Sequence, residues 1–200
     1  MRARSWMLIP AVAAIAAGSL TTAHAAAEPK AATDFTLKDA NGNEHTLSDQ
    51  KGKWVILEWV NHDCPFVVRH YRSGNIPALQ AKYREAGAVW FAICSSAPGT
   101  QGYFEGDALR ARIEREKSVP TAYLIDSEGT VGRAYGARTT PQIVIINPEG
   151  QVVYNGGIDD RPRGGDDATC YVTKVMTAAL AGEEIPISES RPYGCSVKYK

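Results

Sequence analysis

One cysteine occupies a position that suits reactive thiol chemistry better than it suits packing. In the stretch EWVNHDCPFVVRHY, residues 58–71, Cys64 comes directly after an apolar segment and is followed at once by Pro65. Proline is favoured in the first turn of a helix, so we expect Cys64 at the helix N-cap, where free backbone N–H groups and the helix dipole stabilise an anion. The thiolate is the nucleophile in cysteine chemistry. The position therefore predicts a thiol with a lowered pKa.

The two residues before Cys64 act on its charge in opposite directions. A protonated His62 is expected to stabilise the thiolate, whereas Asp63 opposes it and is expected to turn toward water. The alternative interpretations are structural. In these, Cys64 is a small buried hydrophobic residue or half of a structural disulfide, and His62 is a hydrogen-bonded loop residue.

A proline stands directly before a later apolar segment, QIVIIN, residues 142–147. The triplet Thr139-Thr140-Pro141 is unusual there, because proline has no backbone N–H to donate to a neighbouring strand. Proline fits this position if its peptide bond is cis, or if the side that lacks the donor faces a site. Taken alone, the triplet is also compatible with a plain turn. Opposite a cysteine at a helix start, Thr140 and Pro141 are expected to leave backbone groups free to hold an extended thiol or disulfide substrate.

Three further cysteines are candidates for a partner of Cys64. Cys195 is the first candidate for a resolving thiol, because it lies in a polar tail that we expect to be mobile enough to reach Cys64. Cys94 is a rival, since it ends the next buried strand, and Cys170 is expected near the same end of the sheet. A structural Cys170–Cys195 bridge is the main alternative. Four cysteines allow three full pairings, and the sequence does not choose among them.

The apolar pattern of the chain predicts the elements that place these residues. Apolar and polar residues alternate around the turn dipeptide Asn41-Gly42, which indicates an N-terminal hairpin over 33–47. Nearly continuous apolar runs are typical of strands buried on both faces. The predicted strands cover 53–60, 88–94, 121–125, 142–147 and 151–155, and the predicted helices start at 65 and cover 78–86, 107–117 and 169–180. This order predicts an α/β protein with a mixed central sheet flanked by helices, and with Cys64 and Cys94 at the carboxyl ends of strands.

The first 25 residues have the pattern of an export signal. A basic start with Arg2 and Arg4 precedes an apolar run over 6–20, and Ala23-His24-Ala25 supplies a cleavage site. We therefore divide the chain into a signal peptide over 1–25, one domain over 26–187 and a C-terminal tail over 188–200. The protein is expected to be exported, periplasmic or secreted, with no membrane anchor after cleavage, and an uncleaved anchor is the alternative. Disulfides form and persist in such compartments.

Several other kinds of site are disfavoured by composition and spacing. The chain has 22 basic and 22 acidic side chains without a dense Lys/Arg run, so no nucleic-acid partner is expected. No metal is expected, because Cys64 and His70 do not share a helical face and no C-x-x-C knuckle exists. Phosphate-binding glycine motifs and a serine-hydrolase elbow are also missing, and no cofactor is expected.

Taken together, these stretches resemble the exported branch of the thioredoxin-like redoxins, in the alkyl hydroperoxide reductase/thiol-specific antioxidant superfamily. The resemblance is carried by EWVNHDCPFVVRHY, SSAPGTQGY, VGRAYGARTTPQIVIINPEG, VYNGGIDDRP and RPYGCSVKY, which span nearly all of the chain after residue 25. It implies a thioredoxin-like fold, a redox-active Cys64, Pro141 as a cis-proline and Cys195 as a second family cysteine.

The chain departs from the motifs of both main activities in this superfamily. Asn61 and Val67 stand where a C-x-x-C reductase would have a second cysteine. Leu57 and Asn61 stand where a peroxiredoxin would have the proline and threonine of its peroxide pocket. Arg138 is expected to be an exposed loop residue.

The leading functional hypothesis is an exported thiol-dependent oxidoreductase and antioxidant. Its catalytic residues are Cys64 and Cys195, supported by His62, Pro65, Thr140 and Pro141. Its substrate is a small peroxide or a protein disulfide, and a reducing thiol partner resets it. The alternative, motivated by the missing C-x-x-C, is a non-catalytic binding module that captures a thiol-bearing or metal-bearing partner.

Overall fold

The central sheet is organised around two parallel strands that are buried at every position. In the computed structural model, which describes residues 30–165 and 167–200, these strands are β4 (Val55–Trp59) and β5 (Val89–Cys94). Such complete burial explains why their sequences are nearly continuous apolar runs. The predicted export signal over 1–25 lies outside the described residues.

Within the described residues the main sheet has eight strands, and it is mixed as expected. Its order is β1-β9-β8-β4-β5-β6-β2-β3, with β4, β5 and β6 parallel and the remaining neighbours antiparallel. The hairpin predicted around Asn41-Gly42 is confirmed by the pairing of β2 with β3. The other strands are β1 (Lys30–Ala31), β2 (Thr36–Asp39), β3 (Glu44–Thr46), β6 (Ala122–Ile125), β8 (Gln142–Ile146) and β9 (Gln151–Gly156).

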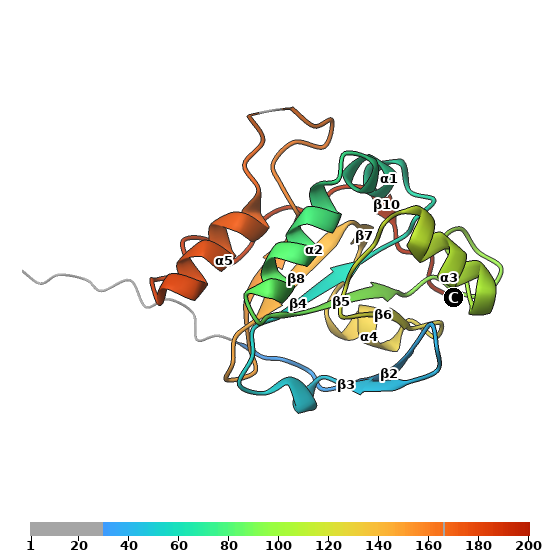
Figure 1. The fold of residues 1–200 in the computed structure, drawn as a ribbon, viewed down its shortest axis with the longest axis horizontal. Helices are drawn as coiled ribbons and strands as arrows, with labels where there is room; N and C mark the ends of the chain where they lie inside the picture. Colours follow the sequence, from blue (N-terminus) through green and yellow to red (C-terminus); the bar gives the residue numbers. More distant parts are fainter. Residues whose placement is uncertain (1–29, 166) are drawn as a thin grey trace, which may run out of the picture.

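Helices cover both faces of this sheet (Figure 1). Alternate residues of β4 point into two separate cores: Ile56 contributes to one, and Val55, Leu57 and Trp59 contribute to the other. The first core is completed by α1 (Pro65–Arg72), α2 (Asn75–Glu85), α3 (Gly106–Arg115) and α5 (Tyr171–Ala181), and the second by α4 (Thr130–Ala134) and the hairpin side. A core on each face of the sheet therefore fixes the position of β4 and of the segment that follows it.

Local differences from the predicted elements have local causes. The second helix begins at Asn75 rather than at residue 78, because Gly74 adopts a left-handed conformation (φ +75°) that lets only two residues, Ser73 and Gly74, separate the two helices. The described residues also contain short elements that the pattern did not predict, since two to five residues carry no measurable periodicity. These are β1, a 3₁₀ turn at Ser48–Gln50, α4, β7 (Thr139–Thr140) and β10 (Cys195–Ser196).

The tail over 188–200 is packed along the protein, contrary to the expectation that it is mobile. Its strand β10 pairs antiparallel with β7, with Cys195 opposite Thr140 and Ser196 opposite Thr139. Beyond the ladder, the backbone N–H of Val197 donates to the Arg138 carbonyl at 3.0 Å. The tail therefore brings Cys195 to the carboxyl end of β4 by fixed main-chain pairing.

Candidate active site

Cys64 is the N-cap of α1, as the sequence predicts. Its backbone is extended (φ −76°, ψ 123°), and Pro65 takes the first helical position. The preceding loop is tied into a turn, because the Cys64 N–H donates to the Asn61 carbonyl at 2.9 Å and the Asn61 side chain accepts from the Asp63 N–H. The thiol points inward and is 0% exposed. The apolar strand and the proline together fix where this sulfur lies.

Hydrogen bonds lower the pKa of the Cys64 thiol against the effect of its burial. Burial by itself raises the pKa, since it penalises the charged form. The thiol of Cys195 and the backbone N–H groups of Val67 and Cys195 act in the other direction and outweigh it. The N–H of Cys195 lies 3.4 Å from Cys64 Sγ. The predicted lowering of the Cys64 pKa is therefore confirmed in direction, although the tail contributes as well as the helix end.

Cys195 is perturbed in the opposite direction. Partial burial, followed by the neighbouring Cys64 sulfur, raises the pKa of Cys195 to about 11. One sulfur of the pair therefore ionises well before the other. When Cys64 loses its proton, its sulfur accepts the hydrogen bond and the Cys195 thiol donates it.

The loop that faces Cys64 contains the expected cis-proline. The Thr140–Pro141 peptide bond is cis, and the Thr140 carbonyl accepts a hydrogen bond from the Cys64 thiol at 3.2 Å. The backbone of this loop was expected to be free for a substrate. It is instead occupied by β10, which pairs with Thr139 and Thr140. The segment of the protein that carries Cys195 therefore lies where an extended substrate was expected.

Gly194 makes this close pairing of the tail possible. It has φ +126°, and a Cβ at this position would collide with the carbonyl oxygen of Thr140. We expect Gly194→Ala to loosen β10 from β7 and to raise the rate at which iodoacetamide labels Cys64 in the reduced protein by about tenfold or more, since such strain costs about 1–3 kcal/mol. Labelling is read by peptide mass spectrometry.

The matched control for this change is Gly52→Ala. Gly52 also has a positive φ (+84°), but nothing lies within 4 Å of the added Cβ. The Gly52→Ala substitution should leave the labelling rate of Cys64 unchanged. Equal labelling of Cys64 in the Gly194→Ala protein and the unmodified protein would show that β10 does not control access to the sulfur.

His62 does not have the charge that the sequence suggested. It is 1% exposed, and burial, followed by the charges of Arg112 and Arg115, lowers its pKa to about 3, so the ring is neutral. The ring packs edge-on against Tyr71 and stacks with Tyr123, at centroid distances of 4.8 Å and 5.6 Å. The idea that a protonated His62 stabilises the thiolate is therefore wrong, because the core leaves no water to solvate the cation.

Asp63 is anchored and does not turn freely toward water. Its carboxylate accepts from the Gly102 N–H at 3.2 Å and forms an ion pair with Arg112 at 3.0 Å. Both contacts draw it toward the loop at 100–102. Its negative charge is thus compensated by groups other than the Cys64 sulfur.

The remaining cysteines lie apart from this pair. Cys94 ends β5 as expected, but it is buried, its thiol donates to the Gly102 carbonyl at 3.4 Å, and burial raises its pKa. Cys170 is the N-cap of α5 and lines a small hollow beside His70 and Asp159. All four cysteines are thiols in the structure. The structure brings together Cys64, Cys195, Thr140 and Pro141, whereas Cys94 and Cys170 make their contacts with other groups.

A buried glutamate under the site was missed by the sequence analysis. Glu58, on β4, is 0% exposed and accepts hydrogen bonds from Trp90 Nε1 (2.8 Å), Tyr71 Oη (2.9 Å) and Gln80 Nε2 (3.1 Å). Burial raises its pKa to about 7, although the three donors act against this shift. The sequence did contain a signal for this residue, since Glu58 is the one acidic residue inside the otherwise apolar run ILEWV.

A second missed cluster anchors the tail next to the site. The Tyr193 hydroxyl lies 2.6 Å from Asp159, 2.8 Å from His70 and 2.9 Å from Arg69. Helix α1, which Cys64 begins, is thus linked to the tail only two residues before Cys195. The tyrosine of RPYGC and the acidic residues of IDDRP were visible in the sequence, but nothing there placed them together.

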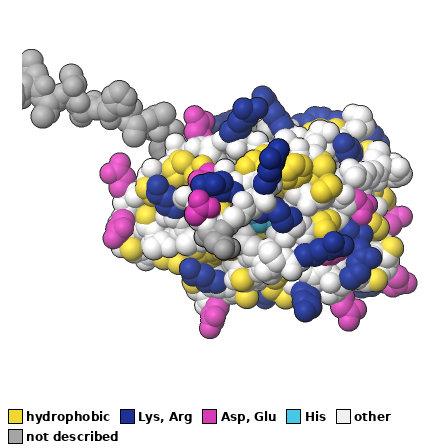
Figure 2. All heavy atoms as spheres, turned by 90° about the horizontal axis from the view of Figure 1, so that it is seen from above, with side chains coloured by type: hydrophobic (Ala, Val, Ile, Leu, Met, Phe, Trp, Pro, Cys, Tyr) yellow, Lys and Arg dark blue, Asp and Glu magenta, His cyan; other side chains and the backbone are white. Residues whose placement is uncertain are grey.

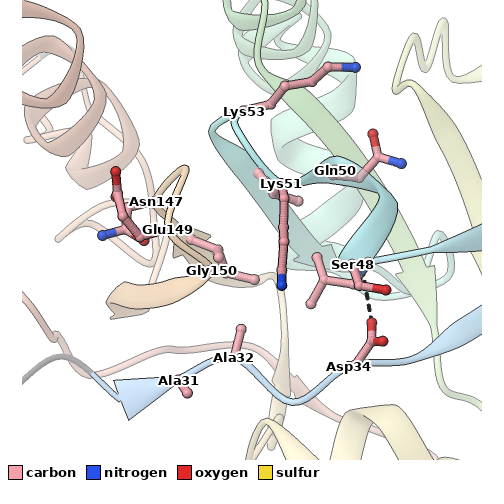
Figure 3. Close-up of a pocket in the computed structure, with 13 residues that line it drawn as sticks. Ala31, Ala32, Asp34, Ser48, Gln50, Lys51, Lys53, Asn147, Glu149 and Gly150 are labelled. Carbon is pink, nitrogen blue, oxygen red and sulfur yellow. Dashed lines mark hydrogen bonds between the residues drawn. The ribbon is translucent and has the colours of Figure 1, made fainter.

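The hollow drawn in Figure 3 lies at the opposite end of β4. It measures about 310 Å³ and is bordered by Val55 at the start of β4, by Ile146 at the end of β8 and by Lys51. The backbone N–H of Ser48 donates to Asp34 there at 2.9 Å. Cys64 follows the other end of β4, so this hollow has no part in the thiol site.

Two features are missing from the described part of the chain. No group of three or more His, Cys, Asp or Glu side chains is arranged to hold a metal ion among residues 30–165 and 167–200. In the same residues, no helix has both the length and the apolar character that a membrane crossing needs.

Comparisons with known proteins agree with this geometry. The family model described as AhpC/TSA family matches residues 29–155. The chain is 26% identical to the thiol-disulfide oxidoreductase ResA of Halalkalibacterium halodurans over 132 residues, which are 65% of this chain and 69% of that protein. It is 37% identical over 59 residues to a probable glutathione peroxidase of Arabidopsis thaliana, covering 30% of this chain and only 34% of the peroxidase.

Solved structures give the fold. An uncharacterised conserved protein from Geobacillus kaustophilus superposes with a TM-score of 0.77 at 28% identity, over 86% of this chain and 92% of that one. The thioredoxin domain of a thiol-disulfide oxidoreductase from Bacteroides vulgatus superposes with a TM-score of 0.51 at 20% identity, over 64% and 86% of the two chains. The expected thioredoxin-like fold is confirmed.

Proposed function

Because the chain belongs to the AhpC/TSA family, we propose that it is an exported thiol-dependent oxidoreductase in which Cys64 is the redox-active nucleophile and Cys195 the resolving cysteine. The two sulfurs alternate between a dithiol and a disulfide. Each cycle passes two electrons and two protons between a substrate and a reducing thiol partner.

One observation carries this proposal: two cysteines 131 positions apart in the chain meet with opposite pKa shifts. The lowered pKa of Cys64 favours its thiolate form, and the raised pKa of Cys195 favours its thiol form, which can donate a proton. A pair that differs in this way is suited to redox exchange, whereas a structural disulfide needs no such asymmetry.

Disulfides are favoured over peroxides as the substrate. The names of the two relatives refer to disulfide exchange and to peroxide reduction, so the family alone leaves both classes open. A peroxide pocket needs polar groups around an accessible thiolate. Leu57 is apolar and points into the second core, and the Asn61 side chain is directed to the Gln101 carbonyl.

Peroxide kinetics test this preference directly. We expect hydrogen peroxide to oxidise Cys64 in the reduced protein no faster than it oxidises free cysteine, measured by stopped-flow fluorescence or thiol titration. The physical reason is that Leu57 and Asn61 do not supply the polar groups that would orient a peroxide at the sulfur. A rate a thousand or more times that of free cysteine would identify a dedicated peroxidase and overturn the preference for disulfides.

Disulfide mapping tests the pairing itself. Mild oxidation with diamide, followed by peptide mass spectrometry, is expected to give a Cys64–Cys195 disulfide while Cys94 and Cys170 remain thiols, because the Cys195 N–H lies 3.4 Å from Cys64 Sγ and the Cys195 thiol hydrogen-bonds to the Cys64 sulfur. A Cys170–Cys195 bridge, or oxidation without any pair, would contradict the proposed function. Export is checked on the same sample, since cleavage after residue 25 leaves Ala26 as the first residue of the mature protein.

A further inference from the structure

A cluster of polar side chains holds the tail just before Cys195. The Tyr193 hydroxyl lies 2.6 Å from Asp159 Oδ1, and Asp159 belongs to the segment that follows β9. Its other two partners belong to α1, with His70 Nε2 at 2.8 Å and Arg69 Nη2 at 2.9 Å. One hydroxyl therefore joins three parts of the chain that are far apart in the sequence.

The chemistry of these groups fixes the direction of each hydrogen bond. A carboxylate accepts and a guanidinium donates, so the hydroxyl proton goes to Asp159 and one hydroxyl lone pair accepts from Arg69. The other lone pair accepts from His70 Nε2, and His70 Nδ1 accepts from the Asn75 amide at 2.8 Å. The ring is therefore neutral with its proton on Nε2, in agreement with the burial that lowers the pKa of His70 to about 4. The hydroxyl uses its donor and both of its lone pairs.

The segment just before Cys195 depends on this side chain for its position. In the described part of the chain, residues 191–194 make no hydrogen bond other than those of the Tyr193 hydroxyl. A hollow of about 590 Å³ borders Tyr193 and Gly194, so the protein does not fill the space on that side of the tail. The Tyr193 ring packs against Phe66 of α1, with 5.7 Å between the ring centroids.

We propose that Tyr193 is a positioning residue of the thiol site, whose hydroxyl holds the tail so that the donors of Cys195 stay at the Cys64 sulfur. The Cys195 N–H lies 3.4 Å from Cys64 Sγ, and Tyr193 is two residues before it. Tyr193 acts on the sulfur through the tail. This inference rests on the proposed function, in which Cys64 is the redox-active nucleophile, and it adds the group that keeps this nucleophile tuned.

The donors that reach Cys64 differ in how they depend on the tail. Burial raises the pKa of Cys64, and hydrogen bonds from the Cys195 thiol, the Val67 N–H and the Cys195 N–H lower it. Val67 belongs to the helix that Cys64 caps, so its N–H stays in place when the tail moves. The Cys195 N–H bond is already long, and a small displacement weakens it further. A loosened tail therefore makes the thiolate less stable without disturbing α1.

Tyr193→Phe separates positioning from charge. Lys and Arg side chains lie over much of the face that Figure 2 shows, which is the face seen from above the α1 end of Figure 1. A variant that changed a charge on this face would alter the potential at Cys64 whatever it did to the tail. Phenylalanine removes only the hydroxyl and keeps the ring that packs against Phe66.

The titration of Cys64 tests the proposal. The reduced proteins are labelled with iodoacetamide between pH 5 and pH 10, and the labelling of Cys64 is read by peptide mass spectrometry. The plateau rate, which reports access, is fitted separately from the midpoint. In Tyr193→Phe we expect a higher midpoint, with the ratio of Cys64 thiolate to thiol at a given pH lowered about fivefold, as for the loss of one ordinary hydrogen bond. An unchanged or lower midpoint would overturn the proposal.

Tyr135→Phe is the matched control for this titration. The Tyr135 hydroxyl donates to the Thr33 carbonyl at 2.6 Å, and its ring lies in the second core, so the variant loses a hydroxyl bond away from the tail. The Cys64 midpoint should stay unchanged. Amide hydrogen exchange over residues 193–198 should be faster in Tyr193→Phe and unchanged in Tyr135→Phe. Equal effects of the two variants would show a general loss of stability and contradict the positioning role.

Asp159→Asn tests rescue by a conservative change. Asparagine keeps an oxygen that accepts from the Tyr193 hydroxyl and removes the negative charge. Removing a negative charge by itself favours a nearby thiolate. The Cys64 midpoint should therefore rise less than in Tyr193→Phe, or not at all. A rise of equal or larger size would show that the charge of Asp159, and not the anchored hydroxyl, controls the sulfur.

Failure of this inference and failure of the proposed function give different results. Oxidation of the unmodified protein with diamide tests whether Cys64 and Cys195 form a disulfide, and this result does not depend on Tyr193. If the disulfide forms and Tyr193→Phe leaves the Cys64 midpoint in place, only the positioning role is overturned. If the disulfide does not form, the proposed function is overturned, whatever the titration shows.

Discussion

Replacing Cys64 with serine is expected to abolish dithiol–disulfide cycling, lowering the rate of disulfide reduction by at least about a thousandfold, to the level of uncatalysed exchange. Removal of a nucleophile commonly costs this much or more, because no other group can form the covalent intermediate. Cys195 is a weak nucleophile by itself, because its partial burial, which raises its pKa, does not depend on Cys64. The rate is measured with insulin as the disulfide and dithiothreitol as the reductant.

Cys170→Ser is the matched control for this result. Cys170 is a cysteine of the same chain, partly exposed, and it caps α5, where serine is a good replacement. Its variant should retain the full rate. A Cys64→Ser protein that retained the rate would show that Cys64 is not the catalytic nucleophile. An unmodified protein with no rate above uncatalysed exchange, together with a Cys64→Ser protein that still captured the partner, would identify a non-catalytic binding module.

Replacing Glu58 with glutamine is expected to remove a large part of the pH dependence of stability. Burial holds the pKa of Glu58 at about 7, above the 4.5 of an ordinary glutamate. The folded protein therefore keeps a proton that the unfolded chain loses between these values. The stability that this group contributes is fully present below pH 4.5 and is lost as the pH rises through 7. The loss amounts to about 3 kcal/mol, taking about 1.4 kcal/mol for each unit of pKa difference.

Glutamine suits the site because its carbonyl oxygen can accept from Trp90 and Gln80 while its amide donates to the Tyr71 hydroxyl. The free energy of unfolding is measured by denaturant titration at pH 5 and pH 9. The unmodified protein should lose about 3 kcal/mol more than the variant between these pH values. The control is Glu149→Gln, which changes an exposed carboxylate. Parallel profiles for Glu58→Gln and the unmodified protein would show that Glu58 is already charged when folded.

The position of Cys64 could be predicted because its determinants are adjacent in the sequence. An apolar run specifies β4, and Pro65 specifies the start of α1, so the N-cap follows without knowledge of distant contacts. The cis bond before Pro141 was likewise signalled by a proline directly before a buried strand. Local signals of this kind involve only a few neighbouring residues, so they can be recognised without knowledge of the tertiary structure.

The surroundings of Cys64 could not be predicted, since they depend on long-range pairing. Strands β7 and β10 have two residues each and lie more than 50 positions apart, so no periodicity marks them. The predicted charge of His62 was wrong for a related reason. Its pKa depends on burial against Tyr71 and Tyr123, which come from two other elements. The sequence shows that a histidine is present, but its exposure to solvent depends on the tertiary structure.

The small size of the β7–β10 ladder links local stability to the chemistry of Cys64. Two paired residues form a weak cooperative unit, so the cover can open without global unfolding. The observed trapping rate of the inner sulfur then equals its intrinsic rate multiplied by the fraction of molecules that are open. Cys64 thus serves as a built-in probe of this opening equilibrium. Mutations that leave the melting temperature unchanged can still shift it.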